Sequence, residues 1–204
     1  MASRGGQRDF SPMNVLTIYA HPNPRSFNRA ILEAVETALR DRGHVTRIHD
    51  LYEMHCRAVL DGEDLMRNWR GDLPADTRRE QDAVLWAHKL VFIYPIWWFG
   101  PPAILKGWID RVFTHKFAFE IGAGGMKGLL THEKALIINT LGGDEATYQR
   151  ERWHELLVRP MAEGVLGACG IRNVAHRAFY EVTTVSDAER RAMLAEIHTL
   201  MAGF

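Results

Sequence analysis

Two hydrophobic periodicities alternate along this chain. Short apolar or alternating runs, bounded by turn residues, predict five β-strands at residues 14–20, 45–50, 90–94, 134–140 and 173–179. Between them, apolar residues at helical spacing predict helices over residues 27–39, 76–87, 101–113 and 160–169, and a last helix after residue 186. Regular alternation of strands and helices is typical of an α/β fold. We therefore expect a single doubly wound domain whose five-stranded parallel sheet has the strand order 2-1-3-4-5.

Capping residues and glycines support these boundaries, but two segments carry no clear pattern. Ser26 precedes the first helix and Gly43 follows it, and Ser186 with Glu189 forms a capping box for the last helix. Residues 51–74 are expected to be irregular or weakly helical. Residues 115–120 are expected to form a short extended arm, and the glycine-rich residues 121–128 a mobile loop. Their glycine spacing fits neither common phosphate-binding motif, so a phosphate loop is the weaker alternative.

The segment of residues 90–113, LVFIYPIWWFGPPAILKGWIDRVF, is the most informative part of the sequence. Its strand is apolar throughout, which is typical of a strand buried on both faces of a parallel sheet. Pro95 cannot donate to the sheet, and Pro101 and Pro102 suit the first turn of the following helix. The loop between them carries bulky residues where turns favour small polar ones, namely Ile96, Trp97, Trp98 and Phe99. A flat apolar ligand would explain this loop, and a dimer contact of its tryptophans is the alternative.

Two further loops follow predicted strands at the carboxyl edge of the sheet, where open α/β sheets bind ligands. The first strand leads into the sequence HPNPRS and a helix start, whose free N–H groups favour a phosphate. The side chains that this loop offers to a phosphate are those of His21, Arg25 and Ser26. The fourth strand ends at Thr140, and Gly142 and Gly143 allow the backbone to approach a ligand closely. Together with the aromatic loop, these features match a phosphorylated flat ring such as a flavin.

Composition narrows the range of partners. The chain holds 25 Lys or Arg and 25 Asp or Glu, so no charge imbalance points to nucleic acid or a membrane surface. No apolar run approaches the length of a membrane span. Cys56 and Cys169 are not in a paired motif and predict free thiols in a reducing cytoplasm. The histidines lack metal-ligand spacing, so no metal is expected. Residues 1–13 are expected to form a disordered tail before the domain of residues 14–204.

Several motifs resemble those of the flavodoxin-like NAD(P)H:quinone oxidoreductases, a family that includes DT-diaphorase and bacterial ancillary subunits of potassium efflux systems. The resemblance rests on YAHPNPRSFN at 19–28, YPIWWFGPPAILKGWIDRVF at 94–113, FAF at 117–119 and LGG at 141–143. It implies a homodimer that binds FAD, or alternatively FMN, and uses NADH or NADPH to reduce a quinone or a similar flat molecule. The sequence leaves open which flavin and which nucleotide are used.

The resemblance also implies roles for individual residues. The flavin phosphate, ribityl chain or pyrophosphate would contact His21, Ser26, Phe27 and Asn28. The residues that would line the isoalloxazine ring are Pro95, Ile96, Trp97, Trp98 and Phe99, with Gly142 and Gly143 at its other edge. Tyr148, which would also contact the flavin, and His154 would stabilise the charge that develops on the N1/O2 side as N5 exchanges a hydride. Without the resemblance, Tyr148 and His154 would be interpreted as surface residues of a polar segment.

The implied activity is a ping-pong cycle in which NAD(P)H reduces the flavin through N5 and the flavin then reduces the acceptor in the same pocket. Two rival functions remain open at the level of sequence. One is a flavodoxin-type electron carrier, and the other is a regulatory subunit whose flavin site serves mainly to bind a partner. The chain departs from better-known members because Phe119 and Ile121 stand where tyrosines reach the site of the partner subunit. This departure bears on acceptor preference more than on flavin binding.

Overall fold

The computed structural model describes residues 12–204, so the tail expected at residues 1–13 lies almost wholly outside the described residues. Within them, a central sheet of five parallel strands consists of β1 (Asn14–Tyr19), β2 (Val45–Asp50), β3 (Lys89–Pro95), β6 (Lys134–Thr140) and β7 (Val174–Phe179). Their order across the sheet is β2-β1-β3-β6-β7. This is 2-1-3-4-5 when the parallel strands are counted along the chain, so the predicted strand order is confirmed.

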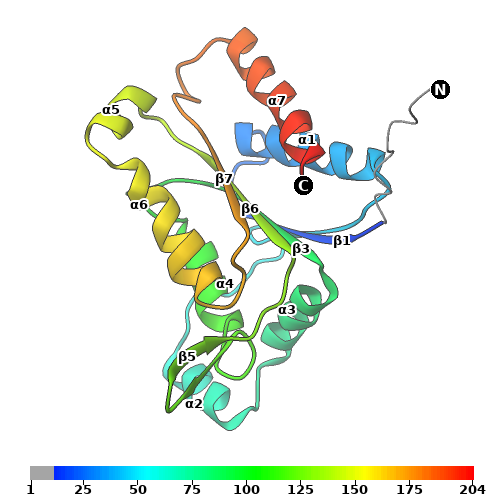
Figure 1. Cartoon of the computed structure of the whole chain (residues 1–204), viewed down its shortest axis with the longest axis vertical. Helices are drawn as coiled ribbons and strands as arrows, with labels where there is room; N and C mark the ends of the chain where they lie inside the picture. Colours follow the sequence, from blue (N-terminus) through cyan, green and yellow to red (C-terminus); the bar gives the residue numbers. More distant parts are fainter. Residues whose placement is uncertain (1–11) are drawn as a thin grey trace, which may run out of the picture.

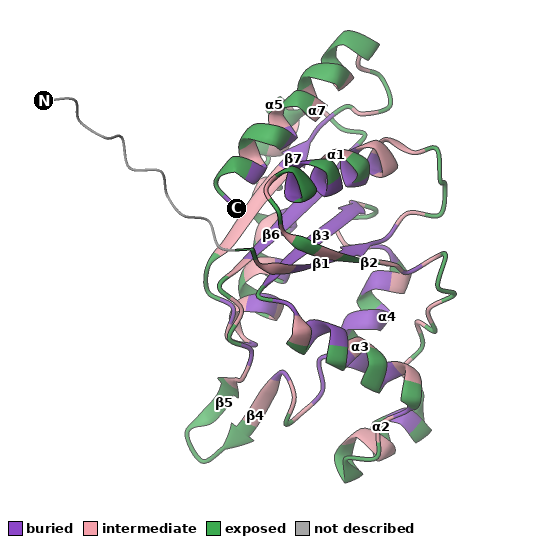
Figure 2. Cartoon of the chain, turned by 90° about the vertical axis from the view of Figure 1, so that its right-hand side faces the viewer, coloured by how far each residue is buried: buried purple, intermediate pink, exposed green. Residues whose placement is uncertain are grey.

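Helices cover both faces of this sheet (Figure 1). One face packs against α1 (Phe27–Asp41) and α7 (Asp187–Ala202). The other face packs against α3 (Ala75–Trp86), α4 (Ala103–Val112) and the π-helical segment η1 (Pro160–Gly167). β3 is buried along its whole length between these layers, whereas β2 lies at the sheet edge and is largely exposed or half-buried (Figure 2). Burial on two faces explains why the sequence of β3 is continuously apolar.

Two predictions about prolines are wrong in detail. α4 begins at Ala103, so Pro102 occupies the N-cap position and Pro101 precedes it. η1 begins at Pro160, but α6 (His154–Arg159) runs directly into it, so Pro160 lies at the junction of two helical segments and not at a free helix start. Proline has no N–H for the α-helical hydrogen bond, and the residues that follow adopt the wider π-helical pattern. His154 is therefore the first residue of one long helical segment.

Two elements lie in regions where the sequence pattern is weak. α2 (Gly62–Arg70) begins where the Asp61 side chain accepts the N–H of Asp64, and it ends at Gly71, whose φ is 75°. β4 (Phe119–Gly122) and β5 (Gly125–Gly128) form an antiparallel hairpin, so the prediction of a mobile loop is wrong. Gly128 is required by packing, because a Cβ there would lie 2.3 Å from the backbone of Cys169. The glycines thus serve chain reversal and close packing, and no helix start follows them to hold a phosphate.

No helix within residues 12–204 is both long enough and apolar enough to cross a membrane.

Candidate functional site

Three loops meet at the carboxyl edge of the sheet, as the strand order predicts. We call them the first turn (residues 20–26), the aromatic turn (residues 96–100) and the glycine turn (residues 141–144). Backbone hydrogen bonds carry strand pairing into these loops, since Ile96 N–H donates to the Thr140 carbonyl and Leu141 N–H to the Phe179 carbonyl, both at 2.9 Å. The rings of His21 and Trp97 lie 6.0 Å apart between centroids and connect the first turn with the aromatic turn. The three loops therefore form one continuous surface.

Ser26 ends the first turn and caps α1. Its Oγ accepts the N–H of Arg29 at 3.2 Å and lies 3.2 Å from the hydroxyl of Tyr19, the last residue of β1. The N–H groups of Phe27 and Asn28 have no acceptor within the helix or elsewhere in the described part of the chain. Free N–H groups at the positive end of a helix dipole are suited to bind an anion such as a phosphate.

His21 adds a side-chain donor to this helix start. The N–H of Asn23 donates to His21 Nδ1 at 3.0 Å, so the neutral ring carries its proton on Nε2. Burial lowers the pKa of His21, which favours this neutral form near neutral pH. Nε2–H is then available to a ligand. Arg25, the third residue expected at the phosphate, has an exposed side chain. The Phe27 ring packs edge-on against that of Phe179, with 6.3 Å between centroids.

Asn28 has a buried oxygen without a partner. Its Nδ2 donates to Thr140 Oγ1 at 2.7 Å, which joins the start of α1 to the end of β6. Its Oδ1 is buried and accepts no hydrogen bond from the described residues. A buried polar atom of this kind is costly unless a ligand or solvent satisfies it. The Asn28 amide oxygen is therefore placed to accept a hydrogen bond from a hydroxyl group of a ligand.

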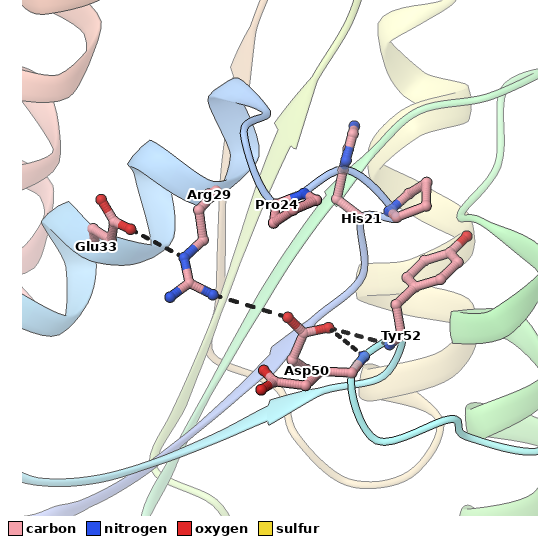
Figure 3. A pocket seen from close by; sticks show the side chains of 8 residues that line it. His21, Pro24, Arg29, Glu33, Asp50 and Tyr52 are labelled. Atoms are coloured by element: carbon pink, nitrogen blue, oxygen red, sulfur yellow. Dashed lines mark hydrogen bonds and ion pairs between the residues drawn. The ribbon is translucent and has the colours of Figure 1, made fainter.

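A hollow of about 530 Å³ lies between the first turn, α1 and the end of β2 (Figure 3). Arg29 is already paired there, at 3.0 Å with Glu33 and 4.0 Å with Asp50. Asp50 in turn accepts the N–H groups of Tyr52 and Glu53, at 3.1 and 3.2 Å. Three carboxylates thus line the hollow against one engaged guanidinium. This charge pattern disfavours an anion in the hollow and leaves the α1 N-terminus as the better anion site.

The aromatic turn is tightly closed and strained. Trp97 N–H donates to the Gly100 carbonyl at 3.0 Å and Gly100 N–H to the Trp97 carbonyl at 3.1 Å. Between them, Trp98 and Phe99 have φ values of 50° and 60°, a left-handed pair that normally selects Gly or Asn. Such a conformation costs a side-chain-bearing residue about 1–2 kcal/mol. The Trp98 side chain is nevertheless 97% exposed, and strain combined with exposure points to a function in binding.

The glycine turn leads into α5 (Glu145–Arg150), which carries Tyr148. A Cβ at Gly143 would lie 2.8 Å from the Tyr148 ring, so glycine is needed for the ring to lie against this backbone. The same ring lies 6.1 Å from that of Phe99, measured between centroids, which joins the glycine turn to the aromatic turn. Burial raises the pKa of Tyr148, so its hydroxyl stays protonated near neutral pH and can act as a donor.

His154 lies behind Tyr148, at the start of α6. Its Nδ1 is 2.8 Å from the hydroxyl of Tyr180, the residue after β7. Its ring centroid is 5.7 Å from that of His176. Burial, with the nearby charges of His154 and Arg177, lowers the pKa of His176 to about 4. His154 thus belongs to a polar group that extends from α6 into β7.

The structure brings most of the predicted site residues to this surface, with Arg25 and Trp98 at its exposed margin. Pro95 and Thr140 are paired neighbours at the ends of β3 and β6, beneath the turns. Sequence reasoning missed Tyr19 and Tyr180, whose hydroxyls contact Ser26 and His154. A usable signal was present, because both tyrosines stand at the carboxyl ends of predicted strands.

Comparisons with known proteins agree with this arrangement. A family model described as a flavodoxin-like fold matches residues 13–201. An uncharacterized NAD(P)H oxidoreductase of Haemophilus influenzae is 37% identical over 183 residues, covering 89% of this chain and 91% of the relative. Human ribosyldihydronicotinamide dehydrogenase (quinone) is 30% identical over 201 residues, covering 89% and 87%. The solved NAD(P)H:quinone oxidoreductase of Methanothermobacter marburgensis has a TM-score of 0.85 and 31% identity, covering 94% of this chain and 96% of that one.

The five-stranded parallel sheet, with its site at the ends of β1 and β3, defines the class of flavodoxin-like proteins. Within this class, the chain belongs to the NAD(P)H:quinone oxidoreductase family, which confirms the resemblance seen in its motifs.

Proposed function

We propose that this protein is a flavin-dependent NAD(P)H:quinone oxidoreductase. The observation that carries the proposal is the convergence of an anion-binding helix start, an aromatic turn and a glycine turn on one surface. A flavin needs these three features together, because it combines a phosphate, a polyhydroxyl chain and a flat ring with a polar edge. Family membership supports the same activity.

The residues present fit such a cofactor. The N–H groups at the start of α1, with Ser26 and His21, would hold the phosphate, and Asn28 Oδ1 would accept a ribityl hydroxyl. The aromatic turn would cover the ring, and the N–H groups of Trp98 and Phe99, unpaired among the described residues, would meet its polar edge. When bound, the flavin would supply an N5 that takes a hydride from NAD(P)H and passes it to a quinone.

The chain itself contributes orientation and proton donors. Each cycle moves one hydride from the nicotinamide, and one further proton from solvent completes the hydroquinone. Tyr148 and His154 supply the donor groups for the charge that hydride transfer places on the N1/O2 side. With the flavin ring on the aromatic turn, its other face would be open for the nicotinamide and the acceptor to stack in turn. Sharing one face would make the cycle ping-pong and would require no second nucleotide-binding domain.

We propose FAD as the cofactor, with FMN as the alternative, because the sequence SFN at residues 26–28 resembles the helix start of FAD-binding members. Mass spectrometry of the flavin released by heating decides between them. Comparison of the flavin reduction rates with NADH and with NADPH identifies the donor.

We also propose a cytoplasmic homodimer. Exposed large apolar side chains include Trp97 and Trp98 on the aromatic turn, Trp153 and Leu156 at the start of α6, and Ile121 and Met126 on the hairpin. Apolar patches of this kind are typical of an interface. A dimer seam beside the aromatic turn would complete the wall of the site. Free thiols at Cys56 and Cys169 support a reducing compartment.

An anaerobic visible spectrum of the flavin-loaded protein tests the activity. We expect NADH or NADPH to bleach the flavin band and a soluble quinone to restore it. A flavin that binds but is bleached by neither nucleotide would overturn the proposal and favour an electron carrier. Co-purification of an inactive flavoprotein with a membrane transporter would favour the regulatory subunit instead.

A further inference from the structure

His154 has one hydrogen-bond partner within residues 12–204. Its Nδ1 lies 2.8 Å from the hydroxyl of Tyr180, and its Nε2 has no partner among the described residues. The two nitrogens of an imidazole point in different directions, so Tyr180 cannot reach Nε2 as well. His154 is half-buried, whereas Tyr180 is buried at the end of β7. Tyr180 therefore holds the inner side of the His154 ring and leaves its other nitrogen open.

The direction of this hydrogen bond follows from the surroundings of Tyr180. Burial, reinforced by Glu145 and Tyr148, raises the pKa of Tyr180, so the hydroxyl keeps its proton. The only acceptor found for that proton in the described part of the chain is Nδ1 of His154. A proton on Nδ1 would leave the buried hydroxyl proton without an acceptor, which is unfavourable. Tyr180 is therefore the donor, and neutral His154 carries its proton on Nε2.

His176 is the other ring beside His154, and its own hydrogen bonds remove it as a competing partner. Asn139 Nδ2 donates to the Tyr94 carbonyl at 3.2 Å, so Asn139 Oδ1 is the atom that accepts from His176 Nε2 at 2.8 Å. The proton of His176 is thereby fixed on Nε2 and directed to Asn139. The remaining neighbour with a charge, Arg177, bonds to Glu196 and to the Ala178 carbonyl. Of these neighbours, only Tyr180 bonds to His154.

We propose that Tyr180 is a positioning residue for the oxidoreductase reaction: its hydroxyl orients His154 and fixes the tautomer whose Nε2–H is available to the bound flavin and substrate. This inference rests on the proposed function, in which His154 is a proton donor. It assigns a role to a residue that does not itself touch the reacting atoms. The same logic applies to His21, whose Nε2–H is fixed by the N–H of Asn23.

The test is nitrogen-15 NMR of histidine-labelled protein, with and without flavin, combined with the rate of flavin reduction. The His154 signal is assigned by its loss in His154→Ala. We expect wild-type His154 to be the Nε2–H tautomer and Tyr180→Phe to show a mixture of tautomers. His132 is an internal reference, because its Nε2 is fixed by the Val84 carbonyl at 2.9 Å. Tyr52→Phe is the matched control, because the Tyr52 hydroxyl has no hydrogen-bond partner among the described residues.

In stopped-flow measurements, we expect Tyr180→Phe to slow flavin reduction about 3- to 10-fold, the loss of one neutral hydrogen bond, at unchanged flavin affinity and with an altered pH profile. Tyr52→Phe should change neither the nitrogen-15 signal of His154 nor the rate of flavin reduction. An Nδ1–H tautomer in wild-type protein, or an unchanged tautomer and rate in Tyr180→Phe, would overturn the proposal. These measurements test the role of His154 as a donor separately from the role of Tyr180 in orienting it. If His154→Ala reduces flavin at the wild-type rate, the role of His154 is wrong, while the tautomer measurement still decides whether Tyr180 orients it.

Discussion

His154 and His176 are neighbours whose environments differ in kind. His154 has one open ring nitrogen and one held by Tyr180, whereas His176 donates its only ring proton to Asn139. Burial, reinforced by electrostatic interaction with His154 and Arg177, lowers the pKa of His176 to about 4. His176 therefore stays neutral near neutral pH and does not exchange protons there. Of the two histidines, His154 is therefore the one with a ring nitrogen open to a ligand.

At this scale, we expect His154→Ala to slow flavin reduction by NAD(P)H about 100-fold, because it removes one positioned donor. Flavin affinity should change little, since the phosphate site at α1 and the aromatic turn, which would make most of the flavin contacts, lie elsewhere. Stopped-flow spectroscopy and a flavin titration measure the two effects. His198→Ala, on the exposed side of α7, serves as the control. An unchanged reduction rate would remove His154 from the mechanism.

His176 predicts a pH dependence of stability. Its pKa is about 4 in the folded protein and about 6.5 in an unfolded chain. Between these values the unfolded state binds the extra proton, so the free energy of unfolding falls as pH decreases from about 6.5 to about 4. We expect His176→Gln to flatten the pH dependence in this window. Urea unfolding at pH 7, 5.5 and 4.5 measures it, and a slope equal to that of wild type would contradict the assignment.

At the scale of elements, two serine caps allow structural and binding effects to be separated. Ser26 accepts the N–H of Arg29 at 3.2 Å and Ser186 that of Glu189 at 3.3 Å, so each stabilises the start of a helix. We expect Ser26→Ala and Ser186→Ala each to lower the free energy of unfolding by about 1 kcal/mol. Only Ser26→Ala should also weaken flavin binding, because of these two helices only α1 starts at the site. Flavin affinity lost equally in both variants would contradict this placement.

The elements that could be predicted are those with a strong period or a clear cap. Buried β3 could be predicted from its continuous apolar run. Helices α1 and α7 could be predicted because their apolar spacing and their capping residues indicate the same bounds. α2 could be predicted only as weakly helical. Asp61 and Gly71 mark its ends, but the helix is mostly exposed, so the sequence shows no buried apolar stripe there. The hairpin could not be predicted, because glycines occur both in mobile loops and in closely packed turns. Only the contact of Gly128 with Cys169 shows that these glycines are closely packed.

The site could be located from the sequence, but its internal hydrogen bonds could not. Strand order places the three turns together, and the motifs identify which side chains they carry. The contacts of Tyr180, Asn139 and His176 depend on the register between β6 and β7 and on the path of α6. The path of α6 could not be predicted, because a proline such as Pro160 normally marks the start of a helix. Here Pro160 lies within one continuous helical segment.

At the scale of the whole molecule, the exposed apolar side chains of the hairpin predict self-association. Ile121 is 62% exposed on β4, and the family resemblance places this position near a partner subunit. We expect Ile121→Asp to shift the protein toward monomer in sedimentation analysis and to lower quinone turnover. Val45→Asp, on β2 at the edge of the sheet opposite β7, is the control. An unchanged molecular mass for both variants would exclude the hairpin from the interface.

The aromatic turn has an optical consequence. Trp98 is 97% exposed and Trp97 44%, whereas Trp108 is buried in the core. Indoles in water emit at longer wavelengths than buried ones, and a flavin absorbs in the range where they emit. A flavin ring bound on this turn would quench the emission of Trp97 and Trp98 most strongly, and that of Trp69 on α2, which is 62% exposed, less. The protein thus carries its own fluorescent reporter at the place where its ligand is expected to arrive.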